Sequence, residues 1–156
     1  MGVCAAQLAS LCNPYAAAPP SAGVRIVQQT TYSGAVNPVT SVLLVDDDPQ
    51  IVRAIVPALE VSGLTVKVTT NGQDAIDQVD ASEWDALIVD LGLPDMDGKS
   101  VIRHLRTKFT TPVVVISAQH SAAEVDAANL VGASCFLHKP FRTPDLVQCL
   151  SRLLPN

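Results

Sequence analysis

The feature that most limits how this chain can fold is a regular alternation of short apolar runs with helical windows, which starts at residue 41. The apolar runs cover 41–45, 64–69, 86–89, 113–116 and 134–138, and the helical windows lie near 49–62, 72–81, 99–109, 121–131 and 143–153. Short apolar runs of this kind are typical of strands buried on both faces of a sheet. Five strand–helix units in strict alternation predict a doubly wound α/β fold around a parallel sheet.

Local signals mark several helix ends. Asp48 followed by Pro49 predicts an N-cap and a first helical residue, while Gly63 and Gly132 predict the ends of the first and fourth helices. Pro57 falls inside the first helix, where we expect a kink because proline removes a backbone donor.

Residues 1–40 differ in composition from the rest of the chain. They contain one charged residue, Arg25, and are rich in Ala, Pro and Gly without a sustained apolar period. Such a segment buries too little apolar surface to offset its ordering entropy, so we expect a disordered tail at 1–40 and one domain at 41–156. The apolar run lacks a preceding Lys or Arg, which argues against a secretory signal, and Ala6 breaks the myristoylation motif. No run is long enough to span a membrane, and we expect a cytoplasmic protein.

The charge balance argues against a nucleic-acid or membrane-surface partner. Ten Lys and Arg face fifteen Asp and Glu, for a net charge of −5. A protein that binds phosphate backbones or anionic lipid needs a broad positive surface. We therefore expect no direct contact with nucleic acid or membrane.

The cysteines and histidines show no metal-ligand spacing. We expect free thiols in a reducing cytosol, with two of the cysteines acting as small core residues, and solvent-facing histidines. The residues concerned are Cys4, Cys12, Cys135, Cys149, His104, His120 and His138.

Polar side chains follow four of the apolar runs, where parallel strands would end. Asp46 and Asp47 follow the first run, and Asp90, Ser117 and Lys139 follow the third, fourth and fifth. In a doubly wound sheet this edge carries the ligand site. Clustered carboxylates without His or Cys favour Mg²⁺, and a lysine and a hydroxyl beside them suit a phosphoryl group. A carboxylate can accept a phosphoryl group as nucleophile, and Asp90, at the end of the central strand, is the best candidate.

These residues lie in motifs that resemble the receiver domain of two-component response regulators. The motifs are 42–48 (VLLVDDD), 87–98 (LIVDLGLPDMDG), 115–118 (VISA) and 138–141 (HKPF), in that order along residues 41–156. The resemblance implies a flavodoxin-like (βα)5 sandwich with strand order 2-1-3-4-5. The stretch DLGLP resembles receivers joined to winged-helix transcription factors, yet the chain stops at the fifth helical window. We therefore expect a stand-alone regulator, or one whose output module was lost or removed.

The resemblance also implies a role for each site residue. Asp90 would be the phosphoacceptor, with Asp46, Asp47, Asp90 itself and the Gly92 carbonyl around Mg²⁺. Lys139 would pair with the phosphoryl group. Ser117 would bind a phosphoryl oxygen.

The switch to a signalling state would involve the same strand ends. Phe136 matches an aromatic position whose ring turns inward when Ser117 moves, and Pro140 matches a proline preceded by a cis peptide bond. Asp95 and Asp97 are explained by turn chemistry alone. The expected donor is a histidine kinase or a histidine phosphotransfer protein, the expected target an unknown effector protein, and a homodimer could follow phosphorylation.

Two other functions share some of these residues. A haloacid dehalogenase-like phosphatase also uses an aspartyl phosphate and Mg²⁺, but Gln50 breaks the motif that it would need from Asp46. A pseudo-receiver that only binds a partner would not need every acidic, hydroxyl and lysine position to be filled. The phosphoacceptor would catalyse its own phosphorylation and dephosphorylation, without turnover of a separate substrate.

Overall fold

A computed structural model describes residues 40–119 and 121–154 of the chain. The strands are β1 (Ser41–Val45), β2 (Thr65–Thr69), β3 (Ala86–Asp90), β4 (Val113–Ser117) and β5 (Cys135–His138). The helices are α1 (Pro49–Val61), α2 (Gly72–Ala81), α3 (Gly98–Arg106), α4 (Ala122–Leu130) and α5 (Thr143–Leu153). Strict alternation of strands and helices is therefore confirmed.

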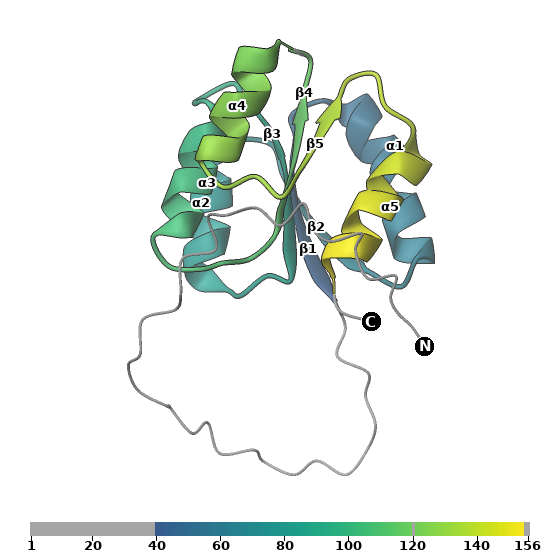
Figure 1. The fold of residues 1–156 in the computed structure, drawn as a ribbon. Coiled ribbons are helices and arrows are strands. Elements are labelled where there is room, and N and C mark those ends of the chain that lie inside the picture. Colours follow the sequence, from purple (N-terminus) through teal and green to yellow (C-terminus); the bar gives the residue numbers. More distant parts are fainter. Residues whose placement is uncertain (1–39, 120, 155–156) are drawn as a thin grey trace, which may run out of the picture. The chain divides into compact units, whose positions relative to one another are not determined.

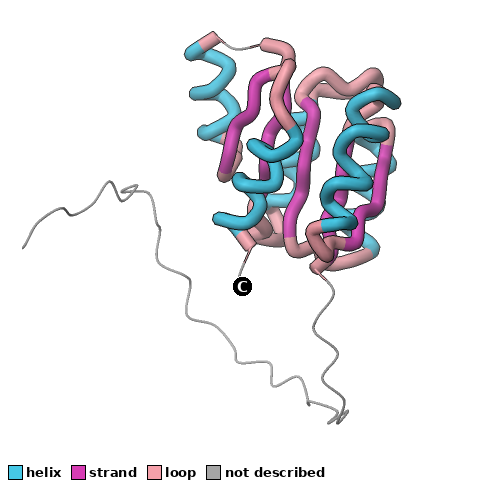
Figure 2. Tube along the Cα trace, turned by 90° about the vertical axis from the view of Figure 1, so that its right-hand side faces the viewer, coloured by secondary structure: helices cyan, strands magenta, loops and turns pink. Residues whose placement is uncertain are grey.

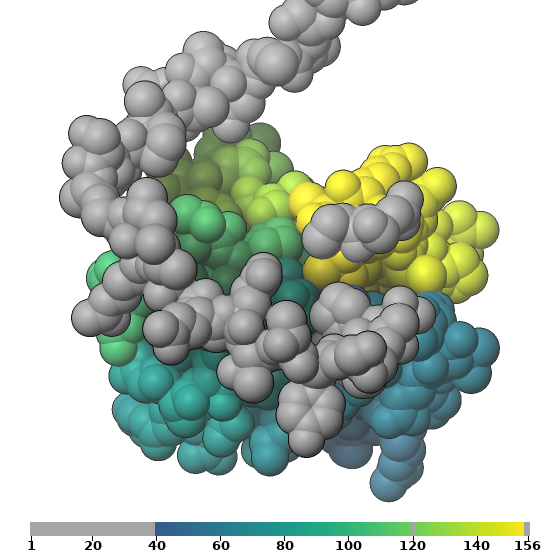
Figure 3. All heavy atoms as spheres, turned by 90° about the horizontal axis from the view of Figure 1, so that it is seen from below, coloured from purple at the N-terminus to yellow at the C-terminus, as the bar shows by residue number. Residues whose placement is uncertain are grey.

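The five strands form one parallel sheet in the order β2-β1-β3-β4-β5, as predicted. Helices α1 and α5 cover one face, and α2, α3 and α4 cover the other (Figure 1). Figure 2 views the sheet from the side of α1 and α5, and Figure 3 shows these two helices, blue and yellow, side by side as seen from below. The layers follow from the period of two along each strand. Leu43 and Val45 pack toward α2 and α3, whereas Val42 and Leu44 pack toward α1 and α5.

Side chains cap the starts of α1 to α4, and the cap predicted at Asp48 is confirmed. Asp48 accepts a hydrogen bond from the backbone N–H of Gln50, and Asn71, Asp97 and Ser121 cap α2, α3 and α4 in the same way. Gly63 follows α1 with a φ of 84°, a conformation that glycine adopts without steric cost.

Three expectations about the elements need correction. Strands β2 and β5 are not buried on both faces, because they lie at the two edges of the sheet. Thr65 and Lys67 of β2 are exposed, and every residue of β5 is only partly buried. Helix α3 ends at Arg106 instead of residue 109, since a turn follows at Thr107. The first residues of two predicted runs, Leu64 and Ser134, lie just before β2 and β5. Pro57 lies within α1, which continues through it to Val61.

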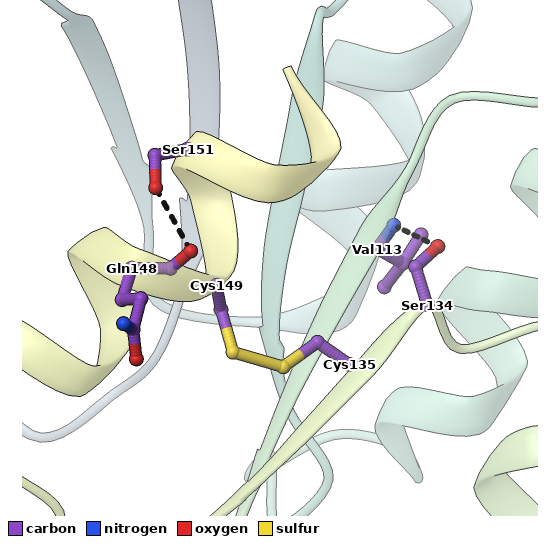
Figure 4. Close-up of a disulfide and its surroundings, with 6 residues drawn as sticks. All are labelled: Val113, Ser134, Cys135, Gln148, Cys149 and Ser151. Atoms are coloured by element: carbon purple, nitrogen blue, oxygen red, sulfur yellow. Dashed lines mark hydrogen bonds between the residues drawn. A yellow bond between two sulfur atoms is a disulfide. The ribbon is translucent and has the colours of Figure 1, made fainter. Parts of the chain in front are cut away.

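The expectation of free thiols is wrong for two of the cysteines. Cys135 on β5 and Cys149 on α5 form a disulfide, with their Cα atoms 6.5 Å apart (Figure 4). The sequence places them in different elements, and only the packing of α5 on the sheet brings them together. Both residues do pack in the core between the sheet and α1 and α5.

Some predictions fall outside the described residues. They are the disorder expected for the tail, of which residues 1–39 are not described, the free thiols expected at Cys4 and Cys12, and the solvent exposure expected for His120. Within residues 40–119 and 121–154, no helix has the length and apolar character needed to cross a lipid bilayer.

Candidate functional site

The strand ends bring together the polar residues that the sequence singled out. Asp46 is fully buried, Asp90 is 6% exposed and Ser117 is 3% exposed, although the core around them is apolar. Asp46 directly follows β1, Asp90 ends β3, Ser117 ends β4 and Lys139 directly follows β5. We call these four residues the sheet wall. Buried charges are costly unless they are paired, so the sheet wall requires a compensating arrangement.

Lys139 supplies that compensation. Its Nζ atom lies 3.0 Å from Asp46 Oδ2 and 3.0 Å from Asp90 Oδ2. Burial favours the neutral amine, but the hydrogen bonds and charges of Asp46 and Asp90 outweigh it and raise the pKa of Lys139 above its ordinary value. The backbone helps to place this side chain, because the Lys139 N–H donates to the Ser117 carbonyl at 2.8 Å. The peptide bond between Lys139 and Pro140 is cis, as the resemblance implies.

One lysine is shared by two carboxylates, of which Asp46 is the more deeply buried. Asp46 Oδ1 also accepts a hydrogen bond from the Asp48 N–H at 2.8 Å. Burial nevertheless raises the pKa of the Asp46 carboxyl above its ordinary value, against the hydrogen bonds from Asp48 and Lys139. This carboxyl would therefore be stabilised in its ionised form by a further cation.

The same carboxylates could hold such a cation. One oxygen each from Asp46, Asp47 and Asp90 lies within 4.8 Å of the others, and Asp47 is exposed to solvent. Carboxylate oxygens with access to water and no His or Cys nearby match the ligands of Mg²⁺. The donor set therefore fits the metal that the sequence predicts.

The loop after β3 surrounds Asp90. The Gly92 N–H donates to Asp90 Oδ1 at 3.2 Å, and Gly92 pairs with Asp97 in an isolated bridge that closes the loop. Gly98 begins α3 against β3, where any Cβ atom would collide with the Asp90 carbonyl. Glycine at this position lets α3 start directly beside the predicted phosphoacceptor.

Asp95 has a larger role than turn chemistry predicts. Its two carboxylate oxygens accept hydrogen bonds from the N–H groups of Gly72 and Gln73, at 2.7 and 2.9 Å. These bonds join the loop after β3 to the start of α2. The hydrogen bond from Gly72, followed by that from Gln73, lowers the pKa of Asp95 below its ordinary value.

The two predicted switch residues lie on neighbouring strands. Ser117 Oγ accepts a hydrogen bond from the Gln119 N–H at 3.0 Å. Phe136 is adjacent to Val115 in the β4–β5 ladder and packs, partly buried, against the cluster between the sheet and α2 and α3. Phe136 does not line the cleft that contains Ser117.

A second group of charged residues faces the sheet wall and was missed in the sequence. Lys99 Nζ on α3 lies 2.6 Å from Glu124 Oε1 on α4 and 3.1 Å from Asp97 Oδ2. We call Asp97, Lys99 and Glu124 the helix wall. The position of Lys99, directly after the loop that follows Asp90, could have flagged it. Nothing in the sequence indicated Glu124.

A cleft of about 410 Å³ separates the two walls. It is lined by Asp90, Leu91, Gly92, Asp97, Lys99, Ser117, Ala118, Gln119, Glu124 and Lys139. The exposed Ala118, being small, leaves the cleft open beside Ser117. Such a cleft could admit a phosphoryl group between two ammonium groups.

The two described histidines, His104 and His138, do not line the cleft. His104 Nε2 lies 2.7 Å from Asp80 Oδ1, and His138 Nε2 lies 3.2 Å from the Ala118 carbonyl. Both side chains are thus partly buried and have partners, in contrast to the solvent-facing histidines that we expected. Trp84, which precedes β3, packs against the core and donates a hydrogen bond to the Gln78 carbonyl at 3.1 Å.

Comparison with known proteins connects this geometry to one family. The sequence model of the response regulator receiver domain matches residues 42–151. The transcriptional regulatory protein KdpE of Mycobacterium tuberculosis is 40% identical over 102 residues, which make up 65% of this chain and 45% of KdpE. TrcR of the same organism is 36% identical over 114 residues, covering 72% of this chain and 44% of TrcR. The chain thus spans about half the length of the curated relatives it matches.

Solved structures agree with the sequence match. The chemotaxis protein CheY4 of Vibrio cholerae has a TM-score of 0.69 and 28% identity, over 74% of this chain and 99% of CheY4. The receiver domain of the Francisella response regulator 1452 has a TM-score of 0.70 and 29% identity, over 73% and 95% of the two chains. These matches favour the receiver over the dehalogenase-like phosphatase that we also considered. The chain belongs to the response regulator receiver family.

Proposed function

We propose that this domain accepts a phosphoryl group on Asp90 from the phosphohistidine of a histidine kinase or phosphotransfer protein. The observation that carries the proposal is the placement of Asp90, which is buried, bonded to Lys139 at 3.0 Å and opens onto a cleft beside Ser117. A carboxylate oxygen of Asp90 attacks phosphorus as the P–N bond breaks. The electron pair of that bond stays on the imidazole nitrogen, which takes up a proton.

Lys139 and Mg²⁺ would together stabilise the negative charge on the phosphoryl oxygens. The Lys139 ammonium already bonds Asp90 and would follow the charge onto the phosphoryl oxygens. Bound Mg²⁺ supplies positive charge for the same oxygens, and we propose Asp46, Asp47, Asp90 and the Gly92 carbonyl as its protein ligands. Hydrolysis by water of the same aspartyl phosphate would reset the domain, so the protein would turn over no separate substrate.

We propose that Ser117 and Phe136 couple phosphorylation of Asp90 to a change at the protein surface. Ser117 has its Oγ at the cleft, where its hydroxyl could donate to a phosphoryl oxygen. Movement of Ser117 would let Phe136, on the adjacent strand, repack more deeply and change the surface formed by α4, β5 and α5. The target of that surface is an effector protein, and a phosphorylation-dependent homodimer would use the same surface. A cytoplasmic location stays a prediction.

The names of the relatives bear on the prediction that this protein makes no direct contact with nucleic acid. KdpE and TrcR are named transcriptional regulatory proteins, which counts against a protein without any direct nucleic-acid contact. We restrict that prediction to residues 41–156. Residues 41–156 contain nine Lys and Arg and fifteen Asp and Glu, and this net charge of −6 supports the restricted form.

The test is incubation with Mg²⁺ and acetyl phosphate, followed by intact-mass measurement. The wild type should gain one phosphoryl group, and Asp90→Asn should gain none. Asp97→Asn is a matched control, because Asp97 is an exposed carboxylate that lines the same cleft and should not be the acceptor. A wild type without added mass, or an Asp90→Asn variant that gains it equally, would rule out the proposal and favour a pseudo-receiver.

A further inference from the structure

The helix wall contains a lysine that the proposed chemistry does not use. Lys99 lies in the first turn of α3 and lines the same cleft as Asp90 and Lys139. Its side chain is 15% exposed, and that of Glu124 is 18% exposed. A half-buried ion pair of this kind loses more hydration than a surface pair, so each partner depends strongly on the other.

The bonds of Lys99 show what holds it. Its ammonium group is 2.6 Å from Glu124 and 3.1 Å from Asp97, so two of its three donors have carboxylate partners. Burial favours the neutral amine, but these two carboxylates outweigh it, and the pKa of Lys99 is raised. Lys99 therefore carries a charge in the cleft, and Glu124 and Asp97 neutralise it before any phosphoryl group arrives.

A phosphoryl group on Asp90 would change this balance. The group brings close to two negative charges into the cleft that Lys99 and Glu124 both line, where it competes with Glu124 for the Lys99 ammonium. Glu124 lies on α4, which has a single buried residue, Ala128, whereas each of the other described helices has at least two. The incoming charge is thus attracted by Lys99 and repelled by Glu124.

Resting on phosphoryl acceptance by Asp90, we propose that Lys99 is a second phosphoryl-binding cation and that Glu124 is its competing counter-ion. Lys99 positions the phosphoryl donor from the helix wall, opposite Lys139. Glu124 limits this attraction and thereby makes the cleft selective for donors of particular charge. When the phosphoryl group takes Lys99, the Glu124 end of α4 loses its ion pair with α3.

The far end of α4 is held independently. Arg106 on α3 donates to the Gly132 carbonyl, just after α4, at 2.7 Å, and to the Thr111 carbonyl at 2.7 Å. Breaking the Lys99–Glu124 pair would thus release the start of α4 while its end stays attached. This gives the phosphoryl group a route to α4 that does not pass through Ser117 and Phe136.

The experiment compares single and double variants of the pair by the rate of phosphoryl gain. Acetyl phosphate is the donor, with Mg²⁺ present at low salt. Lys99→Met leaves Glu124 unpaired and should slow the reaction about tenfold. Glu124→Gln removes the nearer of the two carboxylates that neutralise Lys99 and should accelerate the reaction about fivefold. The double variant Lys99→Met with Glu124→Gln restores the net charge of the wall and should lie within about threefold of the wild type.

The opposite effects of the two single variants on the phosphorylation rate distinguish a role in phosphoryl binding from a purely structural role. If the pair only ties α3 to α4, both single variants should lose activity together and the double variant should not recover. The differences should also shrink at high salt, and should be smaller with phosphoramidate, which carries less negative charge than acetyl phosphate. Lys108→Met and Asp80→Asn break an exposed ion pair away from the cleft and should leave the rates unchanged.

Hydrogen exchange provides a second readout. Amides of the first turn of α4 should exchange faster in Glu124→Gln than in the wild type, while those near Gly132 should not change. If the wild type takes up phosphoryl groups and all variants react at its rate, the role of Lys99 is refuted and phosphoryl acceptance stands. If the wild type takes up none, both proposals fail.

Discussion

The two walls of the cleft differ in how the chain fixes them. In the sheet wall, Asp90 and Ser117 end strands that are paired on both sides, so their positions follow from the backbone ladder. In the helix wall, Lys99 and Glu124 meet through side chains alone, from the first turns of two helices. A ladder cannot shift by one residue without turning every side chain to the opposite face, whereas an ion pair can break and reform.

This difference assigns different tasks to the walls. Reacting groups must be held closely in place, which suits residues fixed by several parallel strands. Groups that sense a new charge must be able to exchange partners, which suits side chains on helices with few buried contacts. We therefore expect substitutions in the sheet wall to affect the chemistry most and those around the helix wall to tune it.

The largest effect should come from Lys139 in the sheet wall. Lys139→Met removes the cation bonded to Asp90 and should slow phosphorylation by acetyl phosphate about 100-fold, as expected when one preorganised donor is lost. Intact-mass time courses measure the rate, and circular dichroism checks the fold. Lys108→Met removes an exposed lysine that pairs with Asp80 and should react like the wild type. Equal rates for Lys139→Met and the wild type would contradict the task assigned to the sheet wall.

Gly98 tests how closely the two walls are joined. Gly98→Ala would place a Cβ atom against the Asp90 carbonyl and the backbone of Leu91, so α3 must move away from β3. The free energy of unfolding should fall by about 2 kcal/mol, measured by urea denaturation. Gly92→Ala is the matched control, because its Cβ atom would lie 3.9 Å from the nearest atom, Asp90 Oδ1. Similar losses for the two variants would argue against a tight join at Gly98.

Much of the sheet wall could be predicted from the sequence, for a physical reason. An apolar run fixes where a strand ends, and the ends of parallel strands meet, so Asp46, Asp90, Ser117 and Lys139 could be placed together without coordinates. The bounds of β1 and α2 were also predicted to the residue, because an apolar run delimits the strand and Asn71 caps the helix.

The remaining features depend on distances between elements, which the sequence does not contain. The pair Lys99–Glu124 forms only because α3 and α4 pack at one particular separation. The same holds for Cys135 and Cys149, since a cysteine count does not give a pairing. The exposed face of β2 was predictable in part, because Lys67 in TVKVT already indicates an edge strand.

Substitution of Asp46 tests whether a residue of the sheet wall lowers the stability of the fold in the absence of Mg²⁺. Burial raises the pKa of Asp46, so its contribution to stability is complete below its ordinary pKa and is lost as the pH rises through the folded value. At neutral pH without Mg²⁺, Asp46→Asn should therefore be more stable than the wild type by about 1 kcal/mol.

Metal removal completes the test of Asp46. The wild type should melt at a higher temperature with Mg²⁺ than with a chelator, because the metal binds only the folded state. The melting temperature of Asp46→Asn should differ little between the two conditions. Asp48→Asn is the control, because asparagine also caps a helix and the Mg²⁺ effect should persist. A Mg²⁺ effect of equal size in Asp46→Asn would remove Asp46 from the metal site.

The smallest effect should come from Asp95, which supports the helix wall from outside by tying the loop before α3 to α2. Hydrogen bonds from Gly72 and Gln73 lower the pKa of Asp95, so its contribution to stability is present above its ordinary pKa of 3.8 and is lost as the pH falls through the lower folded value. Asp95→Ala should therefore melt a few degrees below the wild type at pH 7, and the difference should shrink below pH 3.8.

Asp126→Ala, an exposed substitution in α4, should give no such pH-dependent difference. The melting temperatures of Asp95→Ala and the wild type could instead differ by the same amount down to acid pH. That result would show that the bonds to α2 do not depend on the charge of Asp95. The loop would then be held by its backbone, like the sheet wall, and the charge of Asp95 would not contribute to the support of the helix wall.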